Sequence, residues 1–317
     1  MNIYPDVSYD SDTQSVIDHW CQEINTACEG LDKDRLSELL ASKSANERAL
    51  IHLRYPELFN TSLVNKMNNL TLGDYGKLLQ FLALPIEQAE AMIIHNVTKD
   101  ADTIEKVLIP VLSGRTDKEL GILWNAFFKL YKEYLLLTID DYLSGDIKTF
   151  YFAVLSRRAL EFNPASHNQA RAEELADIMY RAGESKGDEA FFFNTLCSIP
   201  SKFLSTVNAA YARKYDHQLT SAIEKKFGGQ AKDAILYHAN MILHPIETIA
   251  DKLESTMKGI GIDEYGLSAT LVRYQALLPQ AKKAYRAKYN QSLRDRIQGK
   301  TSGDYGKLLL LIYDHSN

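Results

Sequence analysis

Two stretches near the end of this chain decide its fold: Met257-Lys258-Gly259-Ile260-Gly261-Ile262-Asp263-Glu264 and Thr301-Ser302-Gly303-Asp304-Tyr305-Gly306-Lys307-Leu308-Leu309. The first reads as a glycine-containing turn, and the second as another turn that begins an apolar helix. Helical periodicity fills the region between them. The same plan recurs three more times upstream in weaker form, which indicates a protein built from repeated units.

Four glycines set the register of these repeats: Gly73, Gly145, Gly229 and Gly303. Fourteen residues before each glycine stands an aromatic residue, and four residues before that stands another: Tyr55/Phe59, Phe127/Tyr131, Tyr211/Tyr215 and Tyr285/Tyr289. Leucine and then methionine or isoleucine follow at further steps of four: Leu63/Met67, Leu135/Ile139, Leu219/Ile223 and Leu293/Ile297. Steps of four place residues on one helical stripe, although the chain can turn between the aromatic pair and the leucine. Such stripes are normally packing faces, so we predict that these residues form the core.

The spacing of the glycines divides the chain into two halves. The interval between Gly145 and Gly229 is the longest, and the additional residues are polar, contain Pro164 and show no apolar stripe. We predict the following organisation: an N-terminal tail (1–12), repeat I (13–85), repeat II (86–155), a linker (156–169), repeat III (170–246) and repeat IV (247–317). No segment alternates like a half-buried strand, so the predicted fold is all-α, with five short helices in each repeat. Each repeat has too little apolar surface to stand alone, and the repeats should pack together.

Repeat I illustrates the predicted helices. Its expected elements are Gln14–Cys28, Asp32–Ala41, Asn46–Tyr55, a helix opened by Pro56 that carries Leu63 and Met67, and Tyr75–Leu84 with Asp74 as its N-cap. Proline suits the first turn of a helix, and aspartate suits the N-cap.

Composition narrows the class of protein. The 317 residues carry a formal net charge of −5, which does not favour nucleic acid as a partner and requires a local patch or a bridging cation at an anionic membrane. The three cysteines, Cys21, Cys28 and Cys197, form no metal-binding pattern and favour a reducing, cytoplasmic setting. The N-terminus lacks a signal sequence, and no apolar run is long enough to cross a bilayer. No nucleophile–base or metal motif is visible, so we expect no enzyme.

At this point the chain resembles the annexin family. Met257 to Glu264 is similar to the family's Met-Lys-Gly-x-Gly-Thr-Asp-Glu turn between the first two helices of a repeat, and Thr301 to Tyr305 to the turn before the fifth helix. In repeat I, Gly73-Asp74-Tyr75-Gly76-Lys77-Leu78-Leu79 matches Gly303 to Leu309 residue for residue. The likeness covers essentially residues 13–314, and its divergence is similar to that of protist annexins such as the alpha-giardins.

The resemblance implies a curved disc of four five-helix repeats with Ca²⁺ sites in the turns of its convex face. In repeat IV the implied ligands are the backbone carbonyl groups of Met257, Gly259 and Gly261. Ca²⁺ prefers oxygen ligands of this kind, with a bidentate carboxylate added. The family supplies that carboxylate just before its second turn, whereas this chain has the following residues there: Leu70, Tyr142, Lys226 and Lys300.

Several interpretations of these turns stay open. The repeat IV turn either binds Ca²⁺ weakly, roughly in the millimolar range, or is a turn without an ion. In repeat II, Asp100 and Asp102, with Asp141, form either an irregular oxygen site or a solvated acidic loop. Lys226 and Lys300 either contact anionic headgroups, each contributing about 1 kcal/mol of binding free energy, or are ordinary exposed lysines.

Two functions follow as hypotheses. The first is a peripheral membrane protein that binds anionic phospholipid with the help of weak or irregular Ca²⁺ sites. The second is a calcium-independent scaffold of the same fold that binds cytoskeletal or other proteins. Both place the protein in the cytoplasm, on membranes or on the cytoskeleton.

Overall fold

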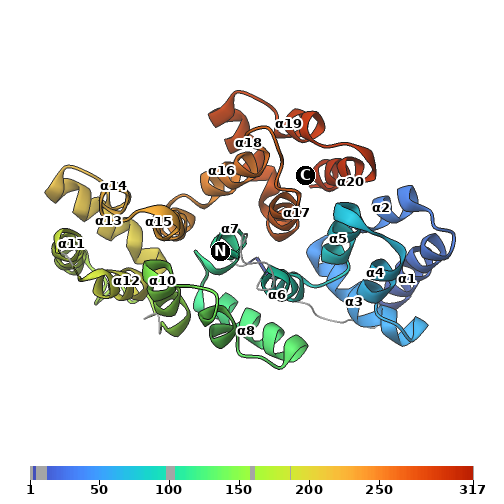
Figure 1. Ribbon diagram of the computed structural model, residues 1–317, viewed down its shortest axis with the longest axis horizontal. Helices are drawn as coiled ribbons and strands as arrows, with labels where there is room; N and C mark the ends of the chain where they lie inside the picture. Colours follow the sequence, from blue (N-terminus) through green and yellow to red (C-terminus); the bar gives the residue numbers. More distant parts are fainter. Residues whose placement is uncertain (1–2, 5–12, 98–103, 158–160, 186, 317) are drawn as a thin grey trace. The chain divides into compact units, whose positions relative to one another are not determined.

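The computed structural model describes residues 3–4, 13–97, 104–157, 161–185 and 187–316, and this part of the chain is helical with no strand. The predicted all-α class is therefore confirmed. Within these residues the structure has twenty α-helices, numbered α1 to α20 (Figure 1).

The helices of the first two repeats are α1 (Gln14–Glu29), α2 (Lys33–Ala41), α3 (Ala45–Phe59), α4 (Leu63–Leu70), α5 (Gly73–Leu82), α6 (Ile86–Val97), α7 (Ile104–Leu112), α8 (Asp117–Tyr131), α9 (Leu135–Asp140) and α10 (Gly145–Ser156). Those of the last two are α11 (Gln169–Glu184), α12 (Glu189–Ser198), α13 (Ser201–Tyr215), α14 (Leu219–Lys226), α15 (Gly229–Leu243), α16 (Pro245–Met257), α17 (Glu264–Arg273), α18 (Leu278–Tyr289), α19 (Leu293–Lys300) and α20 (Gly303–His315). A short 3₁₀ helix, Gln275–Leu277, precedes α18.

The apolar stripes are buried as predicted. The first aromatic residue of each repeat is at most 1% exposed, and the leucines and the methionine or isoleucines after it are at most 3% exposed. The second aromatic is only partly buried, because it ends its helix. The next residue is left-handed in every repeat, with φ between 51° and 59°, at Asn60, Lys132, Asp216 and Asn290. The chain therefore does change direction between the aromatic pair and the leucine.

Two predictions within repeat I were wrong. Pro56 does not open a helix, because α3 already runs from a capping box between Ser44 and Glu47 and continues through the proline to Phe59. The next helix, α4, begins instead at Leu63, and the side chain of its N-cap Ser62 accepts from the Asn65 N–H. Asp74 is not an N-cap, since α5 already starts at Gly73, and it lies in the first turn, where a negative charge suits the helix dipole.

One compact unit joins the two ends of the chain, residues 2–93 and 249–317. Within it α2 packs beside α20, and α5 packs against α17 and α20 (Figure 1). A buried ion pair between Arg273 and Glu90 links these parts, and the Tyr4 hydroxyl donates to the same carboxylate at 2.5 Å. Removing one partner of such a pair is costly because a buried charge remains.

The other compact unit comprises Ile94–Thr248. Here α10 packs against α12 and α15, and α7 lies beside α15. The Gly114 N–H donates to Nδ1 of the buried His238 at 3.1 Å. Burial lowers the pKa of His238 to about 3, so the ring stays neutral and can accept this bond.

The same substitution, glycine to alanine, tests this packing at two positions. It should destabilise the protein at Gly114 and stabilise it at Gly121. Gly114 has φ +70°, and a Cβ there would lie 2.3 Å from the Met241 Cβ. We expect Gly114→Ala to lower the free energy of unfolding by about 2–4 kcal/mol through strain and overpacking.

Gly121 lies inside α8, and a Cβ there would meet nothing within 4 Å. Gly121→Ala should raise stability by about 0.5–1 kcal/mol, since glycine weakens a helix interior. Urea unfolding followed by circular dichroism compares the two variants with the wild type. Equal effects from both variants would contradict this account of the α7–α15 contact.

Candidate cation site in the inter-helix turns

The second turn of each repeat is built around its anchor glycine. Gly73, Gly145, Gly229 and Gly303 all have left-handed φ, between 55° and 66°, a conformation that glycine adopts without strain. In repeat IV, Thr301 precedes this glycine, and its hydroxyl donates to the Ile297 carbonyl at 2.8 Å. A Cβ on Gly306 would lie 2.9 Å from that hydroxyl oxygen, so the second glycine allows a close approach. Repeat I has the same arrangement at Thr71 and Gly76.

A tyrosine between these glycines ties the second turn to the helix that follows the first turn. The Tyr305 hydroxyl donates to the Glu264 carbonyl at 2.7 Å and lies 3.0 Å from the Ser268 hydroxyl. Burial raises the pKa of Tyr305, which keeps the donor protonated. Tyr75 makes the same two contacts in repeat I, with the Lys33 carbonyl and the Ser37 hydroxyl, both at 3.0 Å. The residue-for-residue match of the two stretches therefore has a structural cause.

The first turn of repeat IV directs its carbonyl groups toward two cationic side chains. The Met257 side chain is buried, whereas Gly259, Ile260 and Gly261 are exposed. Lys300 Nζ donates to the Gly259 carbonyl at 2.7 Å, and Arg296 Nη2 donates to the Met257 carbonyl at 3.1 Å. Two of the three carbonyl groups predicted to bind Ca²⁺ therefore accept from side chains of α19.

Arg296 is fixed on its other side by a carboxylate. Its Nη2 and Nε donate to the two oxygens of Glu254 at 2.7 and 3.2 Å, and the Tyr285 hydroxyl donates to the same carboxylate. At the N-terminal end of α17, Asp263 accepts from the Gly266 N–H at 2.8 Å and caps the helix. The turn is thus held from both sides.

Repeat III places a lysine in the same way. Lys226 Nζ donates to the Ala182 carbonyl at 2.8 Å and to the Ser185 carbonyl at 2.6 Å, and it lies 3.8 Å from Glu189. The pKa of Glu189 lies below its usual value, because the carboxylate accepts from its own backbone N–H and that of Gly187 and faces the ammonium. Lys226 is therefore directed into the turn rather than extended toward solvent.

Repeats I and II differ from this pattern. Asp100 and Asp102 lie outside the described residues, and Asp141 is exposed at the C-terminal end of α9. In repeat I the Gly30 N–H donates to the Thr26 carbonyl at 3.0 Å and the Asp32 N–H to the Ala27 carbonyl at 2.9 Å. Repeat I therefore closes its first turn with its own backbone.

Exposed aliphatic side chains mark the tips of several turns, which the sequence reasoning missed. Ile260 is fully exposed, Leu72 is 89% exposed and Leu31 is 67% exposed. Leu72 also borders a hollow of about 490 Å³ between the second turns of repeats I and IV. There Lys33 Nζ lies 3.0 Å from Asp304. In the sequence, the three aliphatic residues could have been found because each stands next to a glycine of a turn.

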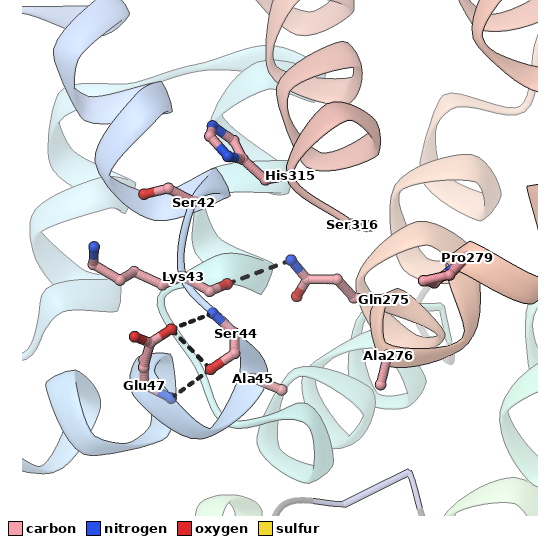
Figure 2. Close-up of a pocket in the computed structure, with 10 residues that line it drawn as sticks. All are labelled: Ser42, Lys43, Ser44, Ala45, Glu47, Gln275, Ala276, Pro279, His315 and Ser316. Carbon is pink, nitrogen blue, oxygen red and sulfur yellow. Dashed lines mark hydrogen bonds between the residues drawn. The ribbon is translucent and has the colours of Figure 1, made fainter.

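A second hollow, of about 240 Å³, lies between the α2–α3 connection, the start of α18 and the end of α20 (Figure 2). Its polar side chains hold helix ends together. Ser44 and Glu47 form the capping box of α3, and Gln275 donates to the Lys43 carbonyl at 3.3 Å. We assign this hollow a structural role.

Comparison with known proteins identifies the family and the fold. The annexin family model matches residues 249–312. Rat annexin A5 (Rattus norvegicus) is 30% identical over 288 residues, covering 89% of each chain, and dog annexin A13 (Canis lupus familiaris) is 28% identical over 93% of this chain and 95% of the relative. Among solved structures, annexin III has a TM-score of 0.87 at 26% identity, covering 98% of this chain and 95% of its own. Calcium-bound alpha-14 giardin has a TM-score of 0.80 at 20% identity, covering 94% and 99%, which shows a shared fold.

The chain belongs to the annexin family. Annexins are in general Ca²⁺-dependent phospholipid-binding proteins that associate with membranes peripherally. Among the described residues, no group of three His, Cys, Asp or Glu side chains is placed to hold a metal ion. No helix in this part of the chain is long and apolar enough to cross a membrane.

Tyr305→Phe tests the link between the two turns of repeat IV. The variant removes the hydroxyl that contacts Glu264 and Ser268, and we expect it to lower the free energy of unfolding by about 1 kcal/mol. Hydrogen exchange at the start of α17 should become faster. Tyr134→Phe is the control, because that side chain is 66% exposed and the change should be neutral. Equal stability of both variants would show that the tyrosine link is dispensable.

Proposed function

We propose that this annexin is a peripheral protein that binds the surface of anionic phospholipid membranes through its inter-helix turns. It acts by binding, with no catalytic step, in a cytoplasmic setting. The observation that carries the proposal is the exposure of Ile260, Leu72 and Leu31 at turn tips beside cationic groups. Aliphatic side chains gain free energy on leaving water, and nearby ammonium groups attract anionic headgroups.

The charges near these tips support the same conclusion. The whole chain is acidic, so an anionic surface repels it at long range. Lys300 lies behind Ile260 and places positive charge where this aliphatic group is exposed, whereas Lys33 beside Leu72 is paired with Asp304. Local attraction can then act within about 10 Å, which is the screening distance at moderate ionic strength.

We expect Ca²⁺ to contribute weakly. Ca²⁺ at the Met257, Gly259 and Gly261 carbonyl groups would have to displace the bonds from Lys300 and Arg296. No carboxylate completes the set at position 300. Asp100, Asp102 and Asp141 remain proposed ligands of an irregular site in repeat II.

A calcium-independent scaffold for cytoskeletal or other proteins is the second candidate function. It is favoured by the same lysine–carbonyl bonds, since they hold turns together without a metal. Microtubule and actin co-sedimentation in chelator would identify it, provided that vesicle binding is absent.

Vesicle co-sedimentation tests the membrane proposal. Phosphatidylserine–phosphatidylcholine vesicles should pellet the protein in chelator, and millimolar Ca²⁺ should increase the bound fraction modestly. Pure phosphatidylcholine vesicles are the control and should bind little. Absence of binding to anionic vesicles at every Ca²⁺ concentration would refute the proposal.

Ile260→Asp should weaken binding to anionic vesicles by about ten-fold or more. The variant loses the aliphatic side chain that the bilayer would bury, and it adds a negative charge. Leu53→Asp is a matched control, since Leu53 is 55% exposed on α3 and lies in no turn. Both variants should keep the wild-type circular dichroism spectrum. Equal losses in the two variants would indicate a general charge effect rather than insertion of this turn.

A further inference from the structure

Two repeats share a contact that the family likeness does not predict. In repeat IV the ammonium of Lys300 binds the Gly259 carbonyl, and in repeat III that of Lys226 binds the Ser185 carbonyl. The separation along the chain is 41 residues in both cases. Both lysines end the helix before the second turn, α19 and α14 respectively. The same donor, the same type of acceptor and the same chain separation in two different sequences indicate a common role.

The chemical setting of each ammonium is that of a bound hard cation. Its partners are backbone carbonyl oxygens at or just beyond the C-terminal ends of α16 and α11. Such carbonyl groups have no partner within the helix, and the helix dipole makes this end negative. Carbonyl oxygen is also the ligand type that Ca²⁺ prefers. An ammonium and a divalent cation therefore compete for one position.

We propose that Lys300 and Lys226 act as tethered cations that occupy the metal position of these two turns and determine their specificity against Ca²⁺. They hold the turns of repeats III and IV in the same conformation with and without millimolar Ca²⁺. This inference deepens the proposed function. It rests on that function only in taking the surface that the turns face to be an anionic membrane.

The environment of Lys226 adds an independent argument. Its ammonium bonds to two carbonyl oxygens and lies 3.8 Å from the Glu189 carboxylate. Its side chain is only 11% exposed, so few other positions are open to the charge. Removing the ammonium would leave three oxygen atoms facing one another without a cation. A carboxylate at position 226 would complete an oxygen cage of the kind that Ca²⁺ occupies.

The test is a change of cation specificity in the full-length protein. Lys300→Glu and Lys226→Glu replace each tethered cation by a carboxylate. Isothermal titration with CaCl₂, in the absence of lipid, should detect a new Ca²⁺ site in each variant, bound at least about ten-fold more tightly than by the wild type. Hydrogen exchange of peptides covering residues 258–263 or 182–185 should slow on Ca²⁺ addition in the corresponding variant and stay unchanged in the wild type.

Matched controls carry the same charge change elsewhere. Lys225→Glu alters the exposed neighbour of Lys226 on α14, and Lys283→Glu alters an exposed position on α18. Neither control should gain a Ca²⁺ site. Lys300→Gln removes the ammonium without adding a carboxylate, so exchange in the turn should become about ten-fold faster, and millimolar Ca²⁺ should slow it less than in Lys300→Glu.

Each outcome decides the proposal. It is overturned if the glutamate variants gain no Ca²⁺ affinity, if Ca²⁺ slows exchange in the wild-type turns equally, or if Lys300→Gln leaves exchange unchanged. Should one glutamate variant fail to fold by circular dichroism, the other and Lys300→Gln still provide the answer. Failure of the wild type to bind anionic vesicles would refute the proposed function while leaving the lipid-free titration intact.

Discussion

Carbonyl groups at the C-terminal ends of helices have no N–H partner within the helix, and the turns of this annexin depend on how that need is met. In repeat I the backbone supplies the donors, through Gly30 and Asp32. In repeats III and IV the donors are side chains from the next turn of the same repeat. One requirement of the backbone thus has two solutions in one chain, and only the second leaves a positive charge in the turn.

The repeat architecture could be predicted because packing imposes a simple period. Steps of four between aromatic and aliphatic residues hold across all four repeats, and their burial follows directly from that spacing. Pro56 was misplaced because propensity favours proline at a helix start, whereas the capping box at Ser44 had already set where α3 begins. The left-handed residues after the aromatic pairs were not foreseen, since none of them is a glycine.

The candidate site was only partly predictable. The absence of a carboxylate at positions 226 and 300 was visible in the sequence, but the direction of the two lysine side chains was not. A lysine can extend into solvent or fold back, and the choice depends on where a carbonyl 41 residues away comes to lie. Arg296 was missed for the same reason, because its role depends on Glu254 and Met257 from another helix.

The division of the chain into units has a consequence for biosynthesis. The unit Ile94–Thr248 is continuous in sequence, so it is synthesised before repeat IV is complete. The other unit is formed by both ends of the chain, so α2 and α5 cannot pack until α17 and α20 have been synthesised. Domains generally fold as units during synthesis, and surface left uncovered in the meantime is prone to aggregation. Repeat I therefore waits longest for its packing partners, because α17 and α20 are the last helices of that unit to be synthesised.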